Sequence, residues 1–572
     1  MTTSSVDHWS AILTFILFVF SNAAVIYPVR VSVPTWLICH IRPLLVATHI
    51  LAESRSPVRK TNIRLNFITV PLISVLILLA TGAIDGTVVR DGIVGSNGVQ
   101  PLDIMALFIS LAYLSISLDA TGLLRFLAFW VVGKGGGSGR RLFAYLYAFF
   151  LICGVIVGND PVILSGTAFL AYLTRVSGMT NPKAWIFSQF AAANMASVVL
   201  VSSNPTNLVL SGAFTLKWTS YIAHVILPFL AAAITVYPLL LYMFRSPDLI
   251  PESLDLDLNE VGDIRETLVD KGGAIFGSCL VLVTLGVLVG TSTVGVPVWE
   301  VTVPPACIML ARDIWWDWSR YRSLRVRGAG VNTTAAMDIE LKEFPEGSDL
   351  STRNRTANGR VGEDGDELQE ARERRLVQDA PPRLPPGFVE FVAHHLARVK
   401  RTFPTVSSIA LRLPIPLLPF AFLTFILVNA LSTQGWVGLF AGWWGAWVRV
   451  TGVLGAVGGM GFLSCIFCNL CGTNIGATIL LARLLQIWIA AASPADRERF
   501  GAIYALALGS NFGAFTLTFS ASLAGLLWRR ILRQKGIHVR AREFLRVNFP
   551  IAAVAMTVGC AVLVGEVYVV YR

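Results

Sequence analysis

Short polar motifs interrupt the apolar segments of this sequence at four places. Backbone at membrane depth must keep its N–H and C=O groups hydrogen-bonded, so Gly, Pro and Asn are tolerated inside an apolar run where they line a cavity within the protein. The Asn, Ser and Thr side chains of these motifs supply amide and hydroxyl groups that can hydrogen-bond a polar solute. The motifs cover Val157–Pro161, Ser202–Asn207, Cys468–Asn474 and Gly509–Gly513.

The same motifs have a structural interpretation. Asn, Ser, Thr and Gly also pack membrane helices against one another, so any one motif could be an interhelical contact. Two motifs precede a long polar segment and two follow it, in corresponding order. Interruptions at matching positions of two halves are typical of inverted repeats, so one shared solute cavity is the favoured interpretation.

Two carboxylates, Asp119 and Asp160, also lie within apolar segments. An ionised carboxylate at membrane depth costs about 3 kcal/mol or more, so it marks a path for protons or cations. A carboxyl group whose protonation changes with solute binding would couple proton flow to solute movement. Asp160 lies inside a polar motif and is the first candidate. Asp119 could instead pair with Arg125 or with an arginine of another helix.

Three cysteines, Cys465, Cys468 and Cys471, recur at a spacing of three and would share one face of a helix. Soft thiolates suit trivalent arsenic or antimony. A carrier must release its cargo, however, so small packing residues are the favoured interpretation and no metal site is expected. Arg483 and two further arginines, Arg175 and Arg449, are expected to end helices and extend toward the membrane interface.

The elements that position these residues are membrane-spanning helices. The chain has 54% hydrophobic and 14% charged residues, which is a membrane composition. A span needs about 20 apolar residues. The sequence predicts an all-α polytopic membrane protein with about ten to twelve crossings. The clearest runs are 9–28, 65–84, 101–132, 142–157, 221–244, 273–290, 296–311, 413–431 and 549–571.

The chain divides into four predicted parts. Residues 1–64 form an N-terminal membrane anchor region, 65–311 a first transmembrane repeat, 312–412 a disordered linker and 413–572 a second transmembrane repeat. The linker is predicted from its Arg, Glu, Asp, Gly and Pro content. Clusters of Lys and Arg between spans place the linker and several loops on the cytoplasmic side, so the net charge of +11 indicates topology and no nucleic acid partner.

The successive motifs resemble those of the arsenite permease family of the ion transporter superfamily. The resemblance is carried by Ser117–Leu124, the glycine-rich turn Gly133–Arg141, Gly158-Asn-Asp and Ser203–Val209, and Ser520–Trp528 resembles the family's last re-entrant region. The order matches from about residue 65 to 570. It implies two inverted repeats, each with a re-entrant hairpin and an unwound helix. Members move arsenite, antimonite, dicarboxylates, citrate, silicate or sodium ions.

The resemblance also implies the positions of the site residues. Two departures from the family are the proline that follows Asp160, at position 161, and the lack of an Asp and a Lys on the second unwound helix. The implied residues are Asn159 and Asp160 at the first hairpin tip, Ser203, Asn204, Thr206 and Asn207 on the first unwound helix, Asn469, Thr473 and Asn474 at the second tip, and Ser510 and Asn511 on the second unwound helix.

The expected function is secondary active export of arsenite-like or antimonite-like solutes coupled to protons. The alternative is transport of a dicarboxylate, citrate or another anion with Na⁺ or H⁺. The sequence shows no phosphate-binding loop, GxSxG or HExxH motif, so neither ATP hydrolysis nor another enzymatic activity is expected. No cofactor is expected. The plasma membrane is the default location, and the superfamily suggests a homodimer in the lipid bilayer.

Overall fold

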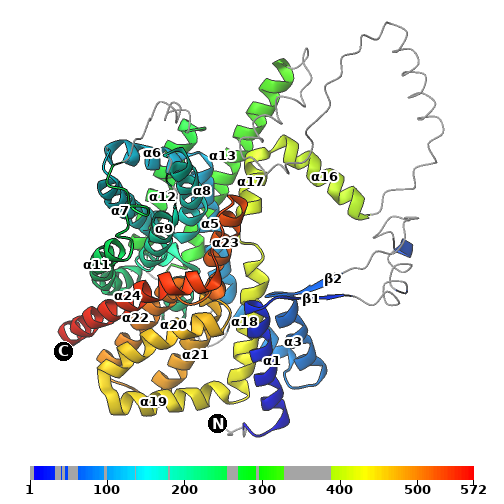
Figure 1. The fold of residues 1–572 in the computed structure, drawn as a ribbon. Helices are drawn as coiled ribbons and strands as arrows, with labels where there is room; N and C mark the ends of the chain where they lie inside the picture. The colour runs from blue at the N-terminus through cyan, green and yellow to red at the C-terminus, as the bar shows by residue number, and fades with distance from the viewer. Residues whose placement is uncertain are drawn as a thin grey trace, which may run out of the picture. The chain divides into compact units, whose positions relative to one another are not determined.

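The part of the chain that the structure describes folds almost entirely into helices (Figure 1). The computed structural model describes residues 6–32, 40, 46–48, 62–95, 100–135, 137–177, 179, 181–253, 268–291, 296–327 and 388–571. Strands β1 (Val29–Ser32) and β2 (Asn62–Leu65) pair in a two-stranded sheet. The chain forms two compact units: residues 1–29, 64–314 and 408–572 make the larger one, and residues 30–63 and 315–407 make the smaller one.

The N-terminal part of the chain contains helices, most of which are joined by short connections. They are α1 (Trp9–Ile26), α3 (Thr69–Ala80), α4 (Gly86–Val94), α5 (Pro101–Ala120), α6 (Leu123–Gly135), α7 (Gly139–Val157), α8 (Asn159–Val176), α9 (Lys183–Ala196), the short 3₁₀ helix η1 (Val201–Ser203), α10 (Pro205–Phe214), α11 (Trp218–Met243), α12 (Lys271–Thr291) and α13 (Val298–Arg327).

Helices of the C-terminal part follow the same pattern of long elements joined by tight turns. They are α16 (Phe388–Thr402), α17 (Pro404–Arg412), α18 (Leu417–Thr433), α19 (Trp436–Leu454), the π-helical turn η3 (Gly455–Gly459), α20 (Met460–Leu470), α21 (Asn474–Ala492), α22 (Asp496–Phe512), η4 (Gly513–Phe515), η5 (Phe519–Ala521), α23 (Leu523–Gln534) and α24 (Ala541–Val570).

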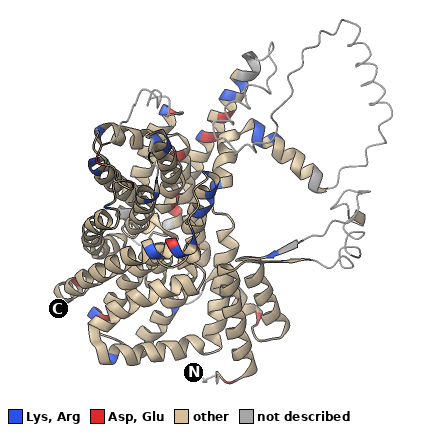
Figure 2. Ribbon diagram, viewed as in Figure 1, with Lys and Arg blue, Asp and Glu red and all other residues tan. Residues whose placement is uncertain are grey.

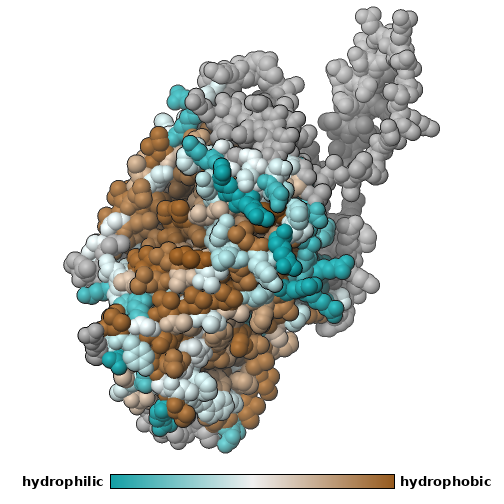
Figure 3. All heavy atoms as spheres, turned by 60° about the vertical axis from the view of Figure 1, so that its left-hand side comes forward, coloured by the Kyte–Doolittle hydropathy of each residue, from teal (hydrophilic) through white to brown (hydrophobic). Residues whose placement is uncertain are grey.

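The expected all-α polytopic membrane fold is confirmed. Within the described ranges, nine helical stretches are long and apolar enough to span a membrane. Figure 3 shows apolar side chains covering much of one face of the molecule, as a lipid-facing surface requires. The stretches are Trp9–Ile26, Pro101–Ala120, Gly139–Val157, Trp218–Met243, Lys271–Leu288, Pro404–Thr433, Trp436–Leu470, Asn474–Ala492 and Ala541–Val570.

Some predicted runs form other elements. The run 101–132 contains two helices, α5 and α6, because Gly122 has a positive φ of 87° between them. The run 65–84 forms only the shorter apolar helix α3. The run 296–311 begins α13, which contains two prolines and continues into a charged stretch, and α13 is not among the nine spans.

Helix forms both ends of the predicted disordered linker, residues 312–412. The C-terminal part of α13 lies at one end, and α16 and α17 lie at the other, so the prediction of disorder is wrong there. The middle of the linker, residues 328–387, lies outside the described residues. In Figure 2 the long helices carry few charged residues, whereas Lys and Arg gather on α16, on α23 and at the start of α24.

Each part of the larger unit contains a helical hairpin followed by a broken helix. In the first, α7 and α8 form the hairpin and α9 breaks through η1 into α10. In the second, α20 and α21 form the hairpin and α22 breaks through η4 and η5 into α23. Because α10 packs against α21 and α22, the two parts meet where their motifs lie. The inverted relation of the two parts remains a prediction from the sequence.

Candidate functional site

The tip of the first hairpin packs directly on the first broken helix. Gly158 joins α7 to α8 with a φ of 94°, and a Cβ atom there would lie 2.8 Å from the backbone oxygen of Ser203. Only glycine meets both conditions without strain. The Ser203 hydroxyl donates to the backbone oxygen of Val155 at 2.6 Å. The start of α8 is therefore held against η1.

A cavity of about 320 Å³ opens at this junction. Within the larger unit it is lined by Asn159 and Asp160 at the start of α8, by Ser202 and Ser203 of η1, and by parts of α5, α17, α18 and α23. Helix α8 packs against both α5 and α23 (Figure 1). The structure thus brings together, around one space, three residues that the sequence assigned to the site and Ser202, which belongs to the same motif.

Several polar groups of this cavity have unused hydrogen-bonding capacity. The Ser202 hydroxyl is buried and has no hydrogen-bond partner among the described residues. The Asp160 carboxylate likewise forms no hydrogen bond or ion pair within the described ranges. Asn159 makes one long hydrogen bond, from its amide nitrogen to Asn194 Oδ1 at 3.5 Å. Buried polar groups are normally satisfied, so a group left open beside a cavity is suited to a ligand.

The Asp119 carboxylate is held by an ion pair and a hydrogen bond to side chains of other helices. Its Oδ2 lies 3.3 Å from Arg412 Nη1, and Ser165 donates to its Oδ1 at 2.5 Å. This matches the alternative interpretation of Asp119 as the partner of an arginine from another helix. Arg412 also lines the cavity, and the exposed Arg530 of α23 lies at its edge. The cavity therefore has open hydroxyl, amide and carboxylate groups, together with one paired and one exposed guanidinium.

Asn204, Asn207 and Asn511 join the two parts of the larger unit instead of facing the cavity. Asn511 donates to Asn207 Oδ1 at 2.7 Å and accepts from Asn204 at 2.9 Å and from Ser197 at 2.9 Å. All these side chains are fully or almost fully buried. Thr206 is also buried, and its hydroxyl donates to Asn207 Oδ1 at 3.4 Å. The interhelical interpretation fits this cluster, because its groups are already bonded to one another.

At the second hairpin tip, Asn469 and Thr473 likewise form internal hydrogen bonds. Asn469 donates to Thr516 Oγ1 at 2.7 Å and accepts from the backbone and hydroxyl of Thr518, each at 3.0 Å. Thr473 caps α21 by accepting from the backbone of Gly476 at 3.2 Å. Asn474 is the buried first residue of α21. None of these residues lines the cavity described above.

The second break lies later in the sequence than predicted. Ser510 and Asn511 belong to the last turn of α22, and the helix unwinds only after Phe512. The polar residues of the break are Thr516, Thr518, Ser520 and Ser522, which sequence reasoning did not assign to the site. Their signal was the alternation of hydroxyl side chains over this short segment. The prediction placed the break early because it followed the Gly-Ser-Asn motif.

The three clustered cysteines pack against α22. The thiols of Cys465 and Cys468 lie 3.4 Å and 3.9 Å from the backbone oxygen of Gly509. All three cysteines, Cys471 included, are buried. In the part of the chain that the structure describes, no group of three His, Cys, Asp or Glu side chains is arranged to hold a metal ion. These thiols fit as small residues in a tight helix contact.

Comparison with known proteins assigns this chain to one family. The family model described as citrate transporter, CitMHS, matches residues 61–509. An arsenical pump membrane protein of Escherichia coli is 30% identical over 210 residues, which is 36% of this chain and 48% of that protein. A second one from Escherichia coli is 25% identical over 230 residues, 40% of this chain and 50% of that protein. The chain thus spans about half the length of the curated relatives it matches.

Solved structures give weaker likenesses. The MtrF efflux pump of Neisseria gonorrhoeae aligns with a TM-score of 0.47 and 11% identity, over 98% of this chain and 94% of that one. The YdaH transporter of Alcanivorax borkumensis aligns with a TM-score of 0.40 and 12% identity, over 97% and 98%. Neither likeness adds to the family match.

Proposed function

Since this chain belongs to the citrate transporter family and is a multi-pass membrane transporter, we propose that it exports arsenite-like or antimonite-like solutes in exchange for protons. The observation that carries this proposal is the cavity at the first hairpin tip. Asp160 and Ser202 line it without a partner among the described residues, and Asn159 makes only one long hydrogen bond there.

The groups of this cavity suit a small neutral hydroxylated solute. An arsenite molecule with three hydroxyl groups both donates and accepts hydrogen bonds, and so do hydroxyl and amide side chains. The Ser202 hydroxyl and the Asn159 amide can each exchange one hydrogen bond with such a solute. A neutral solute has no charge that the protein must balance. The cavity residues at the start of α8 and in η1 include no positively charged side chain. The identity of 25–30% with arsenical pump proteins supports the same solute.

Asp160 supplies the coupling to protons in this proposal. The ionised carboxylate accepts a strong, charge-assisted hydrogen bond from a solute hydroxyl. Protonation removes the negative charge, so the carboxyl group accepts only a weaker bond and solute binding weakens. Protonation on one side of the membrane would release the solute there, and loss of the proton on the other side would restore binding. A ligand shifts a conformational equilibrium only by its difference in affinity for the two states, so this exchange can drive transport.

A second candidate is transport of a carboxylate such as citrate. Arg412 and Arg530 line the same cavity as Asn159, and guanidinium groups bind carboxylates with paired hydrogen bonds. The family model is also that of citrate transporters. This candidate ranks second because Arg412 is already paired with Asp119 and Arg530 is exposed.

Arsenite accumulation in a sensitised host tests both candidates. Cells would express the wild-type chain, Asp160→Asn or the matched control Asp248→Asn, which changes an exposed aspartate, at equal protein levels. We expect lower accumulation with the wild type and the control, and loss of the effect with Asp160→Asn. No reduction with any chain would overturn arsenite export, and citrate uptake by the same cells would then test the second candidate.

A further inference from the structure

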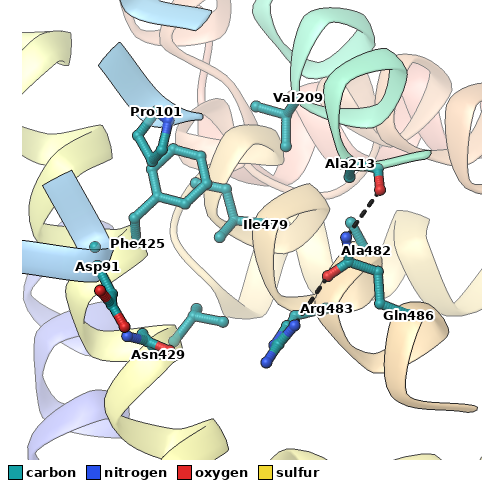
Figure 4. A pocket seen from close by; sticks show the side chains of 12 residues that line it. Asp91, Pro101, Val209, Ala213, Phe425, Asn429, Ile479, Ala482, Arg483 and Gln486 are labelled. Atoms are coloured by element: carbon teal, nitrogen blue, oxygen red, sulfur yellow. Dashed lines mark hydrogen bonds between the residues drawn. The ribbon is translucent and has the colours of Figure 1, made fainter. Parts of the chain in front are cut away.

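A second cavity, of about 50 Å³, lies within the larger unit between α4, α5, α10, α18 and α21. Its polar lining residues are Asp91, Asn429, Arg483 and Gln486. Figure 4 shows Asp91 and Arg483 on opposite sides of this space, with Asn429 near Asp91. Sequence reasoning placed Arg483 at a helix end, but it lies in the middle of α21 and is half-buried.

Three helices, α5, α10 and α18, contribute residues to both cavities. On α10, Pro205 lines the first cavity and Ala213 the second, about 12 Å further along the helix. On α18, Leu417 lines the first cavity and Asn429 the second, about 18 Å apart. Helix α5 also contributes residues to both. The cavities therefore lie one beyond the other along the same three helices.

Arg483 is an unusual residue in this second cavity because its observed hydrogen bonds go to neutral acceptors. Its Nε donates to Ser432 Oγ at 3.3 Å, and its Nη1 donates to Gln486 Oε1 at 3.2 Å. Gln486 is fixed in turn by a hydrogen bond to the backbone oxygen of Ala213 at 2.8 Å (Figure 4). No carboxylate of the described residues forms an ion pair with Arg483.

The position of Arg483 has an energetic consequence. A guanidinium within a spanning helix is expensive and usually faces an aqueous path or a binding site. Its five N–H donors exceed the acceptors that Ser432 and Gln486 provide. Asp91 lies on the opposite wall of the cavity and forms no ion pair with Arg483, so the remaining donors of Arg483 are open to another group. Oxygen atoms of a solute would complete this arrangement.

We propose that the second cavity is the far end of the translocation path and that Arg483 is a solute-binding residue there, donating hydrogen bonds to the solute's oxygen atoms. This inference rests on the proposed transport function. It assigns a role to a cavity that does not contain the hairpin-tip residues. The solute would pass from Asn159 and Ser202 along α10 to Arg483.

Sidedness of thiol labelling tests the path without reference to any solute. Ser202→Cys and Ala482→Cys would each place a thiol in one cavity of the full-length chain in oriented proteoliposomes. A membrane-impermeant thiol reagent would be added outside or loaded inside, with the wild-type chain and its exposed Cys279 and Cys307 as background. We expect the two positions to react from opposite sides. Reaction of both from one side, or of Ser202→Cys alone, would overturn the shared path.

Transport kinetics of Arg483→Gln test the binding role. Hydrogen bonds to charged groups are strong, so we expect the KM for arsenite to rise about tenfold or more. The matched control Arg449→Gln changes an exposed arginine of α19 and should leave KM unchanged. A KM of Arg483→Gln within twofold of the wild type would overturn the role. If arsenite is not transported but labelling occurs from opposite sides, the proposed solute fails and the path stands.

Discussion

The two hairpin tips of this chain have similar residue composition but differ in how far their polar side chains are hydrogen-bonded. At the first tip, Asp160 and Ser202 line a cavity and have no partners among the described residues. At the second tip, Asn469 is bonded to two hydroxyl residues of the adjacent break, Thr516 and Thr518. Each tip has an asparagine at a glycine-containing turn beside a broken helix. A polar motif in a membrane helix therefore identifies a break in the helix. A binding site is identified only where polar side chains of the motif have no hydrogen-bond partner in the protein.

The asparagine cluster between the parts supports this distinction. Asn207 and Asn511 look like site residues in the sequence, yet they bond to each other and lie fully buried. Their bonds hold the start of α10 against the end of α22. We expect such residues to affect stability more than solute affinity. The four predictions that follow separate these two effects, from the largest expected loss of stability to the smallest.

Replacing Asn469 should cost the most stability. Asn469→Ala removes bonds to Thr516 and Thr518 and leaves buried groups unpaired, which we expect to lower the free energy of unfolding by about 3 kcal/mol. Thermal unfolding of the detergent-purified protein measures the change. The control Asn22→Ala removes one local bond, to the backbone oxygen of Phe18, and should cost about 1 kcal/mol. Equal losses for the two variants would contradict the hydrogen bonding of Asn469 at the second tip.

Replacing Gly158 should cost somewhat less. Gly158→Ala adds a Cβ atom 2.8 Å from the backbone oxygen of Ser203 at a positive φ, which we expect to cost about 2 kcal/mol. The control Gly82→Ala has a similar positive φ of 70° and no atom within 4 Å, so it should cost about 1 kcal/mol. Unfolding curves of the two variants isolate the steric part. If they coincide, the first tip does not depend on its close contact with η1.

Replacing Asn159 should separate affinity from stability. Asn159→Ala removes a single hydrogen bond of 3.5 Å, so we expect a loss of stability below about 1 kcal/mol. Its amide is a proposed solute contact, and the KM for arsenite should rise about tenfold. Proteoliposome uptake at several arsenite concentrations gives the KM. An unchanged KM would remove this residue from the site.

Replacing Ser202 should have the smallest effect on stability. Its hydroxyl is buried without a partner among the described residues, so Ser202→Ala should change the free energy of unfolding by less than about 0.5 kcal/mol in either direction. Loss of a neutral hydrogen bond to the solute should still raise KM about fivefold. A clear loss of stability would show that the hydroxyl has a structural partner.

Much of the fold followed from local sequence patterns. The long apolar runs predicted most spanning helices, because a membrane requires about 20 apolar residues for each crossing. The family resemblance implied that Asn159 and Asp160 lie at the first hairpin tip, and in the structure they begin α8 directly after Gly158, which ends α7. The end of α22 was misplaced, however. Asn511 remains helical because its side chain bonds across to Asn207, and a single sequence does not show that partner.

The sequence by itself determined the class of protein. It also determined that two segments each contain a helical hairpin followed by a broken helix, and that Asp160 lies in the first of them. Apolar length, glycine turns and family motifs are local features, so they can be read from neighbouring residues. Only the tertiary structure decided that Asp160 and Ser202 face a cavity while Asn207, Asn469 and Asn511 are bonded, and that Arg483 lines a second cavity. Hydrogen-bond satisfaction depends on residues far apart in the chain, so it exists only once the helices have packed.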